Sequence, residues 1–202
     1  MSLALVKSLL FWSVVGAIVS NIATVLLSIV RPDLRVWPPP RRGSWQYYYD
    51  GIVSLTGLVG VGVLGIVDFD SFLLHHWARF LAGGLLVTSG CFGLWGYLTL
   101  GVHASQGLGG DLVTTGAYYY SRNPQYVGAI AAVSGYAVLC NSSLALIAAL
   151  LVSGWFALVP FAEEPWCREH LGAAYEEYAR QVPRFLGPRR PRRPPTAGES
   201  HR

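Results

Sequence analysis

Long apolar stretches constrain the fold of this chain more than any other feature. A membrane-spanning helix needs about 20 mostly apolar residues, and five stretches qualify, at about 8–30, 51–67, 79–101, 127–139 and 144–162. The fourth is short, so it needs a tilt or an earlier start. The fourth and fifth form a tight hairpin around 141–143. We therefore expect an all-α integral membrane protein with about five transmembrane helices.

The composition excludes several other classes of protein. Charged residues make up 13% of the chain and apolar residues 52%, against about 25% charged in an ordinary soluble domain. A disordered protein, a soluble coiled coil and a nucleic-acid-binding arm do not have these values, so no nucleic acid is expected as a partner. The cysteines share no close spacing, so neither a metal site nor a disulfide framework is expected. The first apolar run is too long for a signal peptide and is expected to be retained.

Basic residues predict the orientation of the helices. With five spans, the loop after the first helix, the loop before the fourth and the segment after the fifth lie on one side. That side collects 13 of the 15 Lys and Arg residues, the exceptions being Lys7 and Arg79. Because basic residues favour the cytoplasmic side, we expect these segments in the cytoplasm and the N-terminus across the membrane.

The chain is expected to be one membrane-embedded domain, 1–186, followed by a tail, 187–202. The tail is rich in Pro and Arg and has no apolar period. It is expected to be disordered and to contact anionic head groups. A specific docking role for the tail is the alternative.

Glycines in the second and third apolar stretches indicate helix packing. Gly60, Gly62 and Gly65 spell GxGxxG, but a dinucleotide-binding fingerprint needs a preceding strand and a soluble βαβ unit. Inside a helix, small residues at this spacing let helices approach closely in lipid. The third stretch has glycines with the same interpretation: Gly83, Gly84, Gly90, Gly93 and Gly96.

Two polar segments stand out against this apolar background. Residues 107–128 are too polar to span, yet they carry three consecutive Tyr residues, Arg122 and an Asn-Pro turn. Either they form an interfacial loop, or the turn presents backbone to a ligand. Glu163 and Glu164 end the fifth stretch, and carboxylates there are costly unless they face water, a cation or a site.

An amphipathic helix is expected after the paired acids, ending near Pro183. Leu171, Tyr175 and Tyr178 recur at helical spacing. This helix either lies flat on the membrane or folds back over the 107–128 segment and closes a pocket.

The two polar segments carry a family resemblance. LVTTGAYYYSRNPQYVG resembles the pattern LVxxGxYxxxRHPxYxG of the integral-membrane isoprenylcysteine carboxyl methyltransferases, and EEPWCREHLGAAYEEYARQVPRF resembles their EExxLxxxFGxxYxxYxxxVPxF. The resemblance covers about 101–185, with both motifs in the same order and a helical hairpin between them. The wider superfamily includes phospholipid N-methyltransferases and sterol reductases.

The resemblance implies an enzyme that transfers a methyl group from S-adenosylmethionine (SAM) to a lipophilic acceptor, with its active site facing the cytoplasm. Arg122 and Glu163 are the candidate catalytic residues. Arg122 would pair with a cofactor carboxylate or with one of the two acids, and the acids would hold the cationic parts of SAM. The resemblance implies these cofactor-binding residues: His103, Gly110, Asp111, Leu112, Val113, Tyr118, Asn123, Pro124, Gln125, Tyr126 and Glu164. For His103, an ordinary interfacial histidine is an equal alternative.

The chain departs from the family pattern at positions that bear on the acceptor. Asn123 stands where the family has His and cannot take a proton, and Pro160 stands where the carboxyl methyltransferases have an Arg that faces the substrate carboxylate. A phospholipid amine or another isoprenoid or lipid acceptor therefore stays open. Two further alternatives are an NADPH-dependent reductase of the sterol type, which the paired acids disfavour, and a non-catalytic membrane protein that retains the fold.

Overall fold

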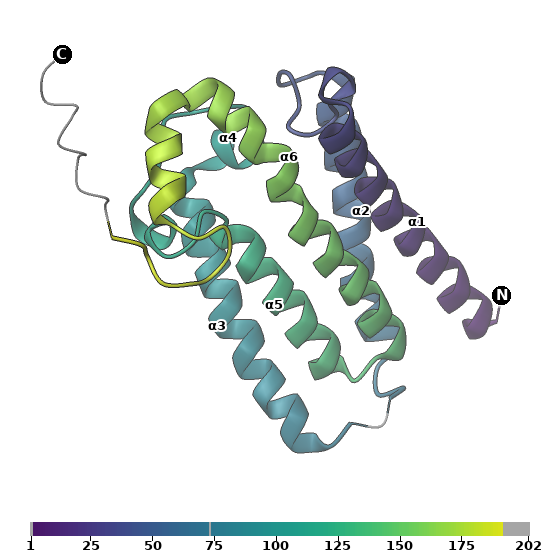
Figure 1. Cartoon of the computed structure of the whole chain (residues 1–202). Coiled ribbons are helices and arrows are strands. Elements are labelled where there is room, and N and C mark those ends of the chain that lie inside the picture. The colour runs from purple at the N-terminus through teal and green to yellow at the C-terminus, as the bar shows by residue number, and fades with distance from the viewer. Residues whose placement is uncertain (1, 73, 192–202) are drawn as a thin grey trace, which may run out of the picture.

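The computed structural model describes residues 2–72 and 74–191, and these contain helices and no strand. The long helices, labelled in Figure 1, are α1 (Leu3–Val30), α2 (Trp45–Val67), α3 (His76–Leu100), α5 (Pro124–Cys140) and α6 (Ser143–Gln181). The short helical segments are η1 (Pro32–Leu34), α4 (Val102–Ser105) and η2 (Gly116–Tyr119).

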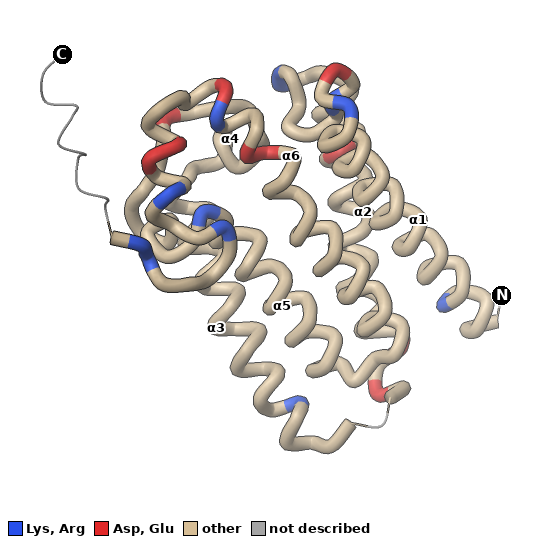
Figure 2. Tube along the Cα trace, viewed as in Figure 1, with Lys and Arg blue, Asp and Glu red and all other residues tan. Residues whose placement is uncertain are grey.

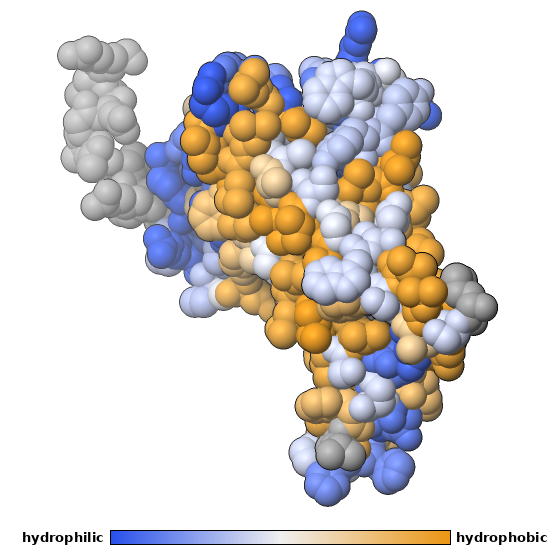
Figure 3. Space-filling view, turned by 90° about the vertical axis from the view of Figure 1, so that its right-hand side faces the viewer, coloured by the Kyte–Doolittle hydropathy of each residue, from blue (hydrophilic) through white to orange (hydrophobic). Residues whose placement is uncertain are grey.

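The expected all-α integral membrane fold is confirmed. Helices α1, α2, α3 and α6 are long and apolar enough to cross a membrane. Helix α5 starts at Pro124, earlier than expected, but its 17 residues span only about 26 Å, less than the hydrocarbon core of about 30 Å. Apolar side chains cover much of the middle of the surface, while the most hydrophilic residues lie at the two ends (Figure 3). The protein is thus a multi-pass membrane protein.

The C-terminal part of α6 differs from the sequence-based expectation of two separate helices. The last apolar stretch and the amphipathic helix form one continuous helix, broken only at Gly172, where φ is 57° and ψ is −139°. This backbone conformation is open to glycine and strained for other residues. After the break the chain turns back toward the α4 region (Figure 1). The amphipathic helix therefore folds back over the 107–128 segment, which was one of the two expected arrangements.

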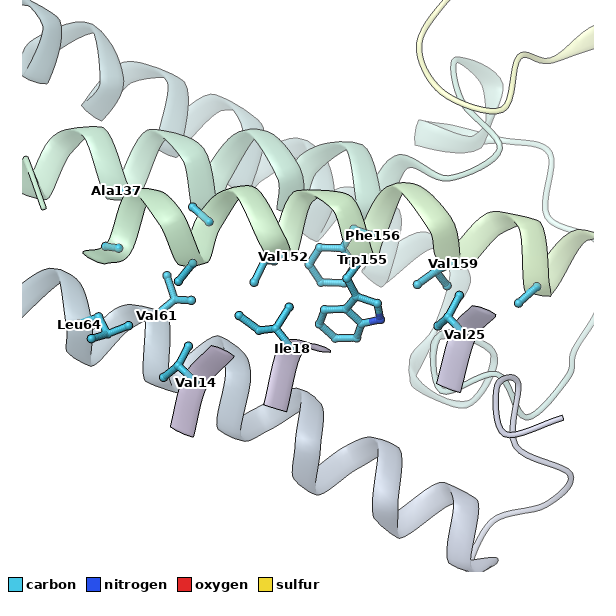
Figure 4. Close-up of a cluster of buried hydrophobic side chains, with 14 residues drawn as sticks. Val14, Ile18, Val25, Val61, Leu64, Ala137, Val152, Trp155, Phe156 and Val159 are labelled. Atoms are coloured by element: carbon cyan, nitrogen blue, oxygen red, sulfur yellow. The ribbon is translucent and has the colours of Figure 1, made fainter. Parts of the chain in front are cut away.

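The core lies where α6 packs between its neighbours. Val14 and Ile18 of α1, Leu64 of α2 and Val152 of α6 are almost fully buried in one cluster (Figure 4). Trp155 and Phe156 of α6 stack within it, with ring centroids 4.5 Å apart. Helix α6 is thereby fixed against α1 and α2, and its continuation beyond this cluster starts from a rigid base.

The glycines of α2 and α3 pack helices together, as predicted, though not at every position. A Cβ at Gly65 would stand 2.6 Å from the Tyr136 ring of α5, and one at Gly96 would stand 2.9 Å from Pro124. In contrast, Cβ atoms at Gly62, Gly84 and Gly90 would meet open space. Small residues let α3 lie close along α5, which sets the position of the Asn-Pro turn at the start of α5.

Charged residues gather at one end of the bundle (Figure 2). The C-terminal half of α6, the α1–α2 loop and the segment before α5 all lie at that end. Lys7 and Arg79 pair with Asp68 and Asp70, which follow α2 at the other end. The first residues of the expected tail are held in place, because Arg190 N–H donates to the Gln181 carbonyl at 2.8 Å. Residues 192–202 lie outside the described residues, so a boundary at 186 stays a prediction.

Asp68 joins three helices at the opposite end. It follows α2, is almost fully buried, and accepts hydrogen bonds from Lys7 Nζ of α1 at 3.0 Å, Ser142 Oγ at 2.8 Å and the Leu144 N–H of α6 at 3.1 Å. Burial of the carboxyl favours its neutral form, but these donors and Ser71 outweigh burial and hold the pKa of Asp68 well below its ordinary value. The carboxylate thus stabilises the fold where α1, α2 and α6 meet.

We expect an Asp68→Asn variant to unfold at a lower temperature than the wild type at neutral pH. A group with a lowered folded-state pKa contributes stability above its ordinary pKa, and that contribution is lost as the pH falls through the folded value. The difference in unfolding temperature between the wild type and Asp68→Asn should therefore become smaller as the pH is lowered from 7 to about 3. Thermal unfolding of detergent-solubilised protein measures it, and a gap that is constant with pH would contradict this role.

Candidate functional site

The two polar segments singled out in the sequence meet in the structure. The Arg122 Nη2 atom lies 3.1 Å from Glu164 Oε1. The Tyr178 hydroxyl donates to the Tyr118 carbonyl at 2.8 Å, and the Arg122 N–H donates to the Pro183 carbonyl at 3.0 Å. Segments about 40 to 60 residues apart in sequence therefore form one site at the charged end of the bundle.

A pocket opens between these segments, with about 840 Å³ of empty space including its open mouth. All but two of the predicted site residues line it: Gly110, Asp111, Leu112, Val113, Tyr118, Arg122, Asn123, Gln125, Tyr126, Glu163 and Glu164.

The other two predicted residues do not reach the pocket. His103 is exposed on α4 and is absent from the pocket wall, so the interfacial alternative fits it better. Pro124 is buried at the first turn of α5, where its ring packs against α3 at Gly96. Pro124 therefore positions the turn and does not line the pocket.

Glu164 is surrounded by arginines. Arg184 binds it with two parallel hydrogen bonds, Nε to Oε1 and Nη2 to Oε2, both of 2.7 Å. Arg122 lies 3.1 Å away and Arg168 3.4 Å away. The fork of Arg184 keeps its guanidinium charged, and the pKa of Arg184 is raised by the hydrogen bond to Glu164. Glu164 is 2% exposed and already has three cationic partners. Its role is therefore to hold these arginines in place, and its oxygens are not free to bind a ligand.

Glu163 has a different environment and keeps one oxygen free. The Trp37 Nε1–H donates to Glu163 Oε1 at 2.8 Å, and the Tyr126 hydroxyl donates to the same oxygen at 2.5 Å. Among the described residues, Oε2 has no hydrogen-bond partner. The carboxylate is thus held in place through one oxygen while the other can accept a bond from a ligand.

Arg122 supplies the complementary group. Its side chain is 10% exposed, and its Nε atom is buried without a hydrogen-bond partner among the described residues. A buried donor without a partner is costly, and Arg122 is one of the residues that line the pocket. A carboxylate oxygen free on Glu163 and a guanidinium donor free on Arg122 together match a zwitterion.

Glycines and aromatic residues form the rest of the pocket wall. Gly107, Gly109 and Gly110 have φ of +70°, +90° and +148°, so this backbone turns in a way that other residues adopt with strain. Gln125 Nε2 donates to the Tyr118 hydroxyl at 3.0 Å. Burial raises the pKa of Tyr118 far above its ordinary value, so its hydroxyl stays neutral and the wall uncharged there.

Sequence reasoning missed several residues of the site. Trp37, to which the motifs assign no role, orients Glu163 from the α1–α2 loop. Arg184, noted only as part of a basic segment, binds Glu164. The helical spacing that placed Tyr175 and Tyr178 on one face was the available signal for that wall, and both residues line the pocket. For Trp37 the sequence contains no such signal, because the contact depends on how α1 packs against α6.

Comparisons with known proteins match the part of the chain that contains most of this site. A family model described as phospholipid methyltransferase matches residues 77–174. Protein-S-isoprenylcysteine O-methyltransferase B of Arabidopsis thaliana is 39% identical over 74 residues, which cover 36% of this chain and 37% of that relative. Both matches are to members of the superfamily of isoprenylcysteine carboxyl and phospholipid methyltransferases, which the two motifs of this chain resemble. The family match contains every residue predicted for this superfamily's site. No solved structure matches the chain significantly, and the aligned part spans little more than a third of the relative.

Proposed function

We propose that the protein is a membrane methyltransferase that uses SAM as methyl donor and a lipid-like molecule as acceptor. The observation that carries the proposal is the pair of pocket-lining residues with unpaired polar atoms, Glu163 with Oε2 and Arg122 with Nε. The amino-acid end of SAM has an ammonium and a carboxylate, which are complementary to these groups. Charged hydrogen bonds of this kind are stronger than neutral ones.

The rest of the pocket also suits SAM. The turn at 107–110 brings backbone to the wall, where hydrogen-bonding groups can contact ribose or adenine. Leu112, Val113 and Leu171 give an apolar lining. The aromatic ring of Tyr126 adds a face for a sulfonium, and cation–π attraction contributes about 0.5–2 kcal/mol. Glu163, held by two donors, is fixed before a ligand arrives.

A second opening supports a lipophilic acceptor. An apolar groove runs between α3 and α5, lined by Gly90, Gly93 and Leu94 on one side and by Gly128 and Ala129 on the other. Gln125 and Tyr126 border both the groove and the pocket. We infer that an acyl or isoprenoid chain lies in the groove, with its head group at Tyr126. The donor and the acceptor would then reach the same point from water and from lipid.

In this reaction the main task of the protein is to position the methyl donor and the acceptor. SAM supplies an electrophilic methyl group, which a lone pair of the acceptor takes while the sulfur leaves as a neutral thioether. Arg122 and Glu163 fix the amino-acid end of the donor, and the groove fixes the acceptor, so that the two meet in line. The apolar lining keeps water away from the reacting atoms.

We place this site on the cytoplasmic side of the membrane. The basic residues gather at the end of the bundle that holds the pocket (Figure 2), and the cytoplasm is the side that such residues favour. A nucleoside cofactor would also be taken from water on that side.

Binding of SAM and NADPH to purified protein separates the proposed function from a reductase of the same superfamily. We expect saturable binding of SAM and of S-adenosylhomocysteine, seen as a rise in unfolding temperature, because a ligand that binds the folded state stabilises it. NADPH should give no shift. A shift with NADPH and none with SAM would contradict the proposal.

The groove can be tested by filling it. Gly90 lines the groove, and a Cβ at this position meets open space. We therefore expect Gly90→Leu to occupy the acceptor's path without disturbing the fold. The rate of methyl transfer at low acceptor concentration should fall about tenfold, which corresponds to about 1.4 kcal/mol, while the affinity for SAM should be unchanged.

Gly84→Leu is the matched control. Gly84 lies on the same helix, also has open space around it, and does not line the groove. We expect wild-type activity from this variant. Equal effects of the two substitutions, or a loss of SAM binding in Gly90→Leu alone, would contradict this route for the acceptor.

A further inference from the structure

The pocket is covered by a part of the chain that folds back over it. Beyond the break at Gly172, the last turns of α6 return across the 107–123 segment (Figure 1). Tyr175 and Tyr178 from this part line the pocket and form a buried cluster with Tyr118 and Val182. In many enzymes a segment that covers the site opens when a ligand is exchanged.

Arg184 holds the folded-back segment in place through contacts of both its side chain and its main chain. Its guanidinium forks onto Glu164 with two bonds of 2.7 Å and lies 4.0 Å over the Phe161 ring. Its carbonyl accepts hydrogen bonds from Asn123 Nδ2 at 3.0 Å and from Ser121 Oγ at 3.3 Å. One residue therefore ties the chain after α6 to the paired acids and to the Asn-Pro turn.

The break at Gly172 has the properties of a hinge. A Cβ at this position would meet nothing within 4 Å, so crowding does not explain the glycine. Its φ of 57° and ψ of −139° explain it instead, because only glycine adopts this conformation without strain. The backbone can reorient at this point at low cost, while α6 before it stays anchored in the core.

We propose that residues 173–190 form a lid over the pocket, hinged at Gly172 and latched by Arg184, which opens to admit and release the cofactor. The identity of that ligand rests on the proposed function; the lid rests on the contacts alone. Arg122 and Arg168, which lie 3.1 Å and 3.4 Å from Glu164, are outside the lid and stay beside Glu164 when it opens. Its buried charge stays paired, so opening does not carry the full penalty of an isolated buried carboxylate.

Cys167 reports on opening of the lid. It is a free cysteine that lines the pocket and packs against the tyrosine cluster. Cys140 is buried at the far end of α5 and reports on global unfolding. In full-length protein with Cys91→Ser, the rate of modification by a membrane-impermeant polyethylene glycol maleimide is followed by gel shift. Such a bulky reagent reaches Cys167 only when the lid is open.

We expect Arg184→Gln to raise the modification rate of Cys167 about tenfold or more, equivalent to about 1.4 kcal/mol, with Cys140 still protected. Arg184→Lys, which keeps the charge but loses the fork, should lie between this variant and the wild type. Gly172→Ala should also raise the rate. Arg180→Gln is the matched control and should leave the rate unchanged. Arg180 lies on the same segment, and its one ion pair among the described residues is with exposed Glu177.

The outcomes separate the lid from the proposed function. Equal rates in Arg184→Gln and Arg180→Gln would overturn the lid, and so would modification of Cys140 in parallel with Cys167. S-Adenosylhomocysteine should slow the modification of Cys167 in the wild type. If the latch variant is fast but S-adenosylhomocysteine gives no protection, the lid stands and the assignment of SAM to the pocket fails.

Discussion

Replacing Glu164 by Gln should weaken the binding of S-adenosylhomocysteine by at least about tenfold and destabilise the protein by about 3–5 kcal/mol, the cost of breaking a buried ion pair. The carboxylate is 2% exposed and holds Arg122, Arg168 and Arg184 around it. The neutral amide leaves three guanidinium groups without their shared counter-charge, so Arg122 loses its position at the pocket. We expect the unfolding temperature of detergent-solubilised protein to fall by roughly 6–20 °C.

Glu169→Gln is the matched control for this variant. Glu169 lies on the same helix, is exposed, and has no ion pair among the described residues. The same chemical change there should leave both the unfolding temperature and ligand binding within error of the wild type. If Glu164→Gln behaved like Glu169→Gln, Glu164 would not organise the site.

The second large effect is expected at Arg122. We predict that Arg122→Gln weakens S-adenosylhomocysteine binding about a hundredfold, since a lost hydrogen bond between two charged groups in a buried site is worth about 2–3 kcal/mol. The donor responsible is Arg122 Nε, which is buried and unpaired among the described residues. The fold should survive, because Glu164 keeps the fork of Arg184. Isothermal titration calorimetry measures the change.

5′-Methylthioadenosine, which lacks the amino-acid end of the cofactor, distinguishes a direct contact from general damage. If Arg122 binds the cofactor carboxylate, this compound should bind the wild type and Arg122→Gln with equal affinity. Glu163→Gln should likewise weaken S-adenosylhomocysteine and spare 5′-methylthioadenosine. A hundredfold loss for both compounds would show that Arg122 supports the pocket without contacting the carboxylate.

The sequence predicts the helices well because hydrophobicity over 20 residues is a local property. It places α1, α2, α3 and α6 correctly, and it predicts α5 with a start only a few residues late. The predicted helix ends are less accurate where the capping residue and the start of the apolar stretch do not coincide. Helix α2 begins at Trp45 because Ser44 caps it, its side chain accepting from the Tyr47 N–H, although the apolar stretch begins later.

The sequence predicts those site residues that belong to the two family motifs. The Asn-Pro turn and the paired acids do meet, and most residues assigned by the family resemblance line one pocket. The division of labour between the acids was not predictable, because Glu163 and Glu164 are adjacent in sequence and differ only in what packs against them. Trp37 reaches one from the first loop, and Arg184 reaches the other from beyond α6.

The central claim is that the pocket joins a SAM molecule to a lipid acceptor. Its most direct test is incubation of the purified protein with SAM labelled in the methyl group and a total lipid extract, followed by extraction into organic solvent. The account predicts label in the organic phase from the wild type and little from Arg122→Gln or Glu163→Gln. Label that stays wholly in the aqueous phase, with SAM bound normally, would contradict a lipid acceptor.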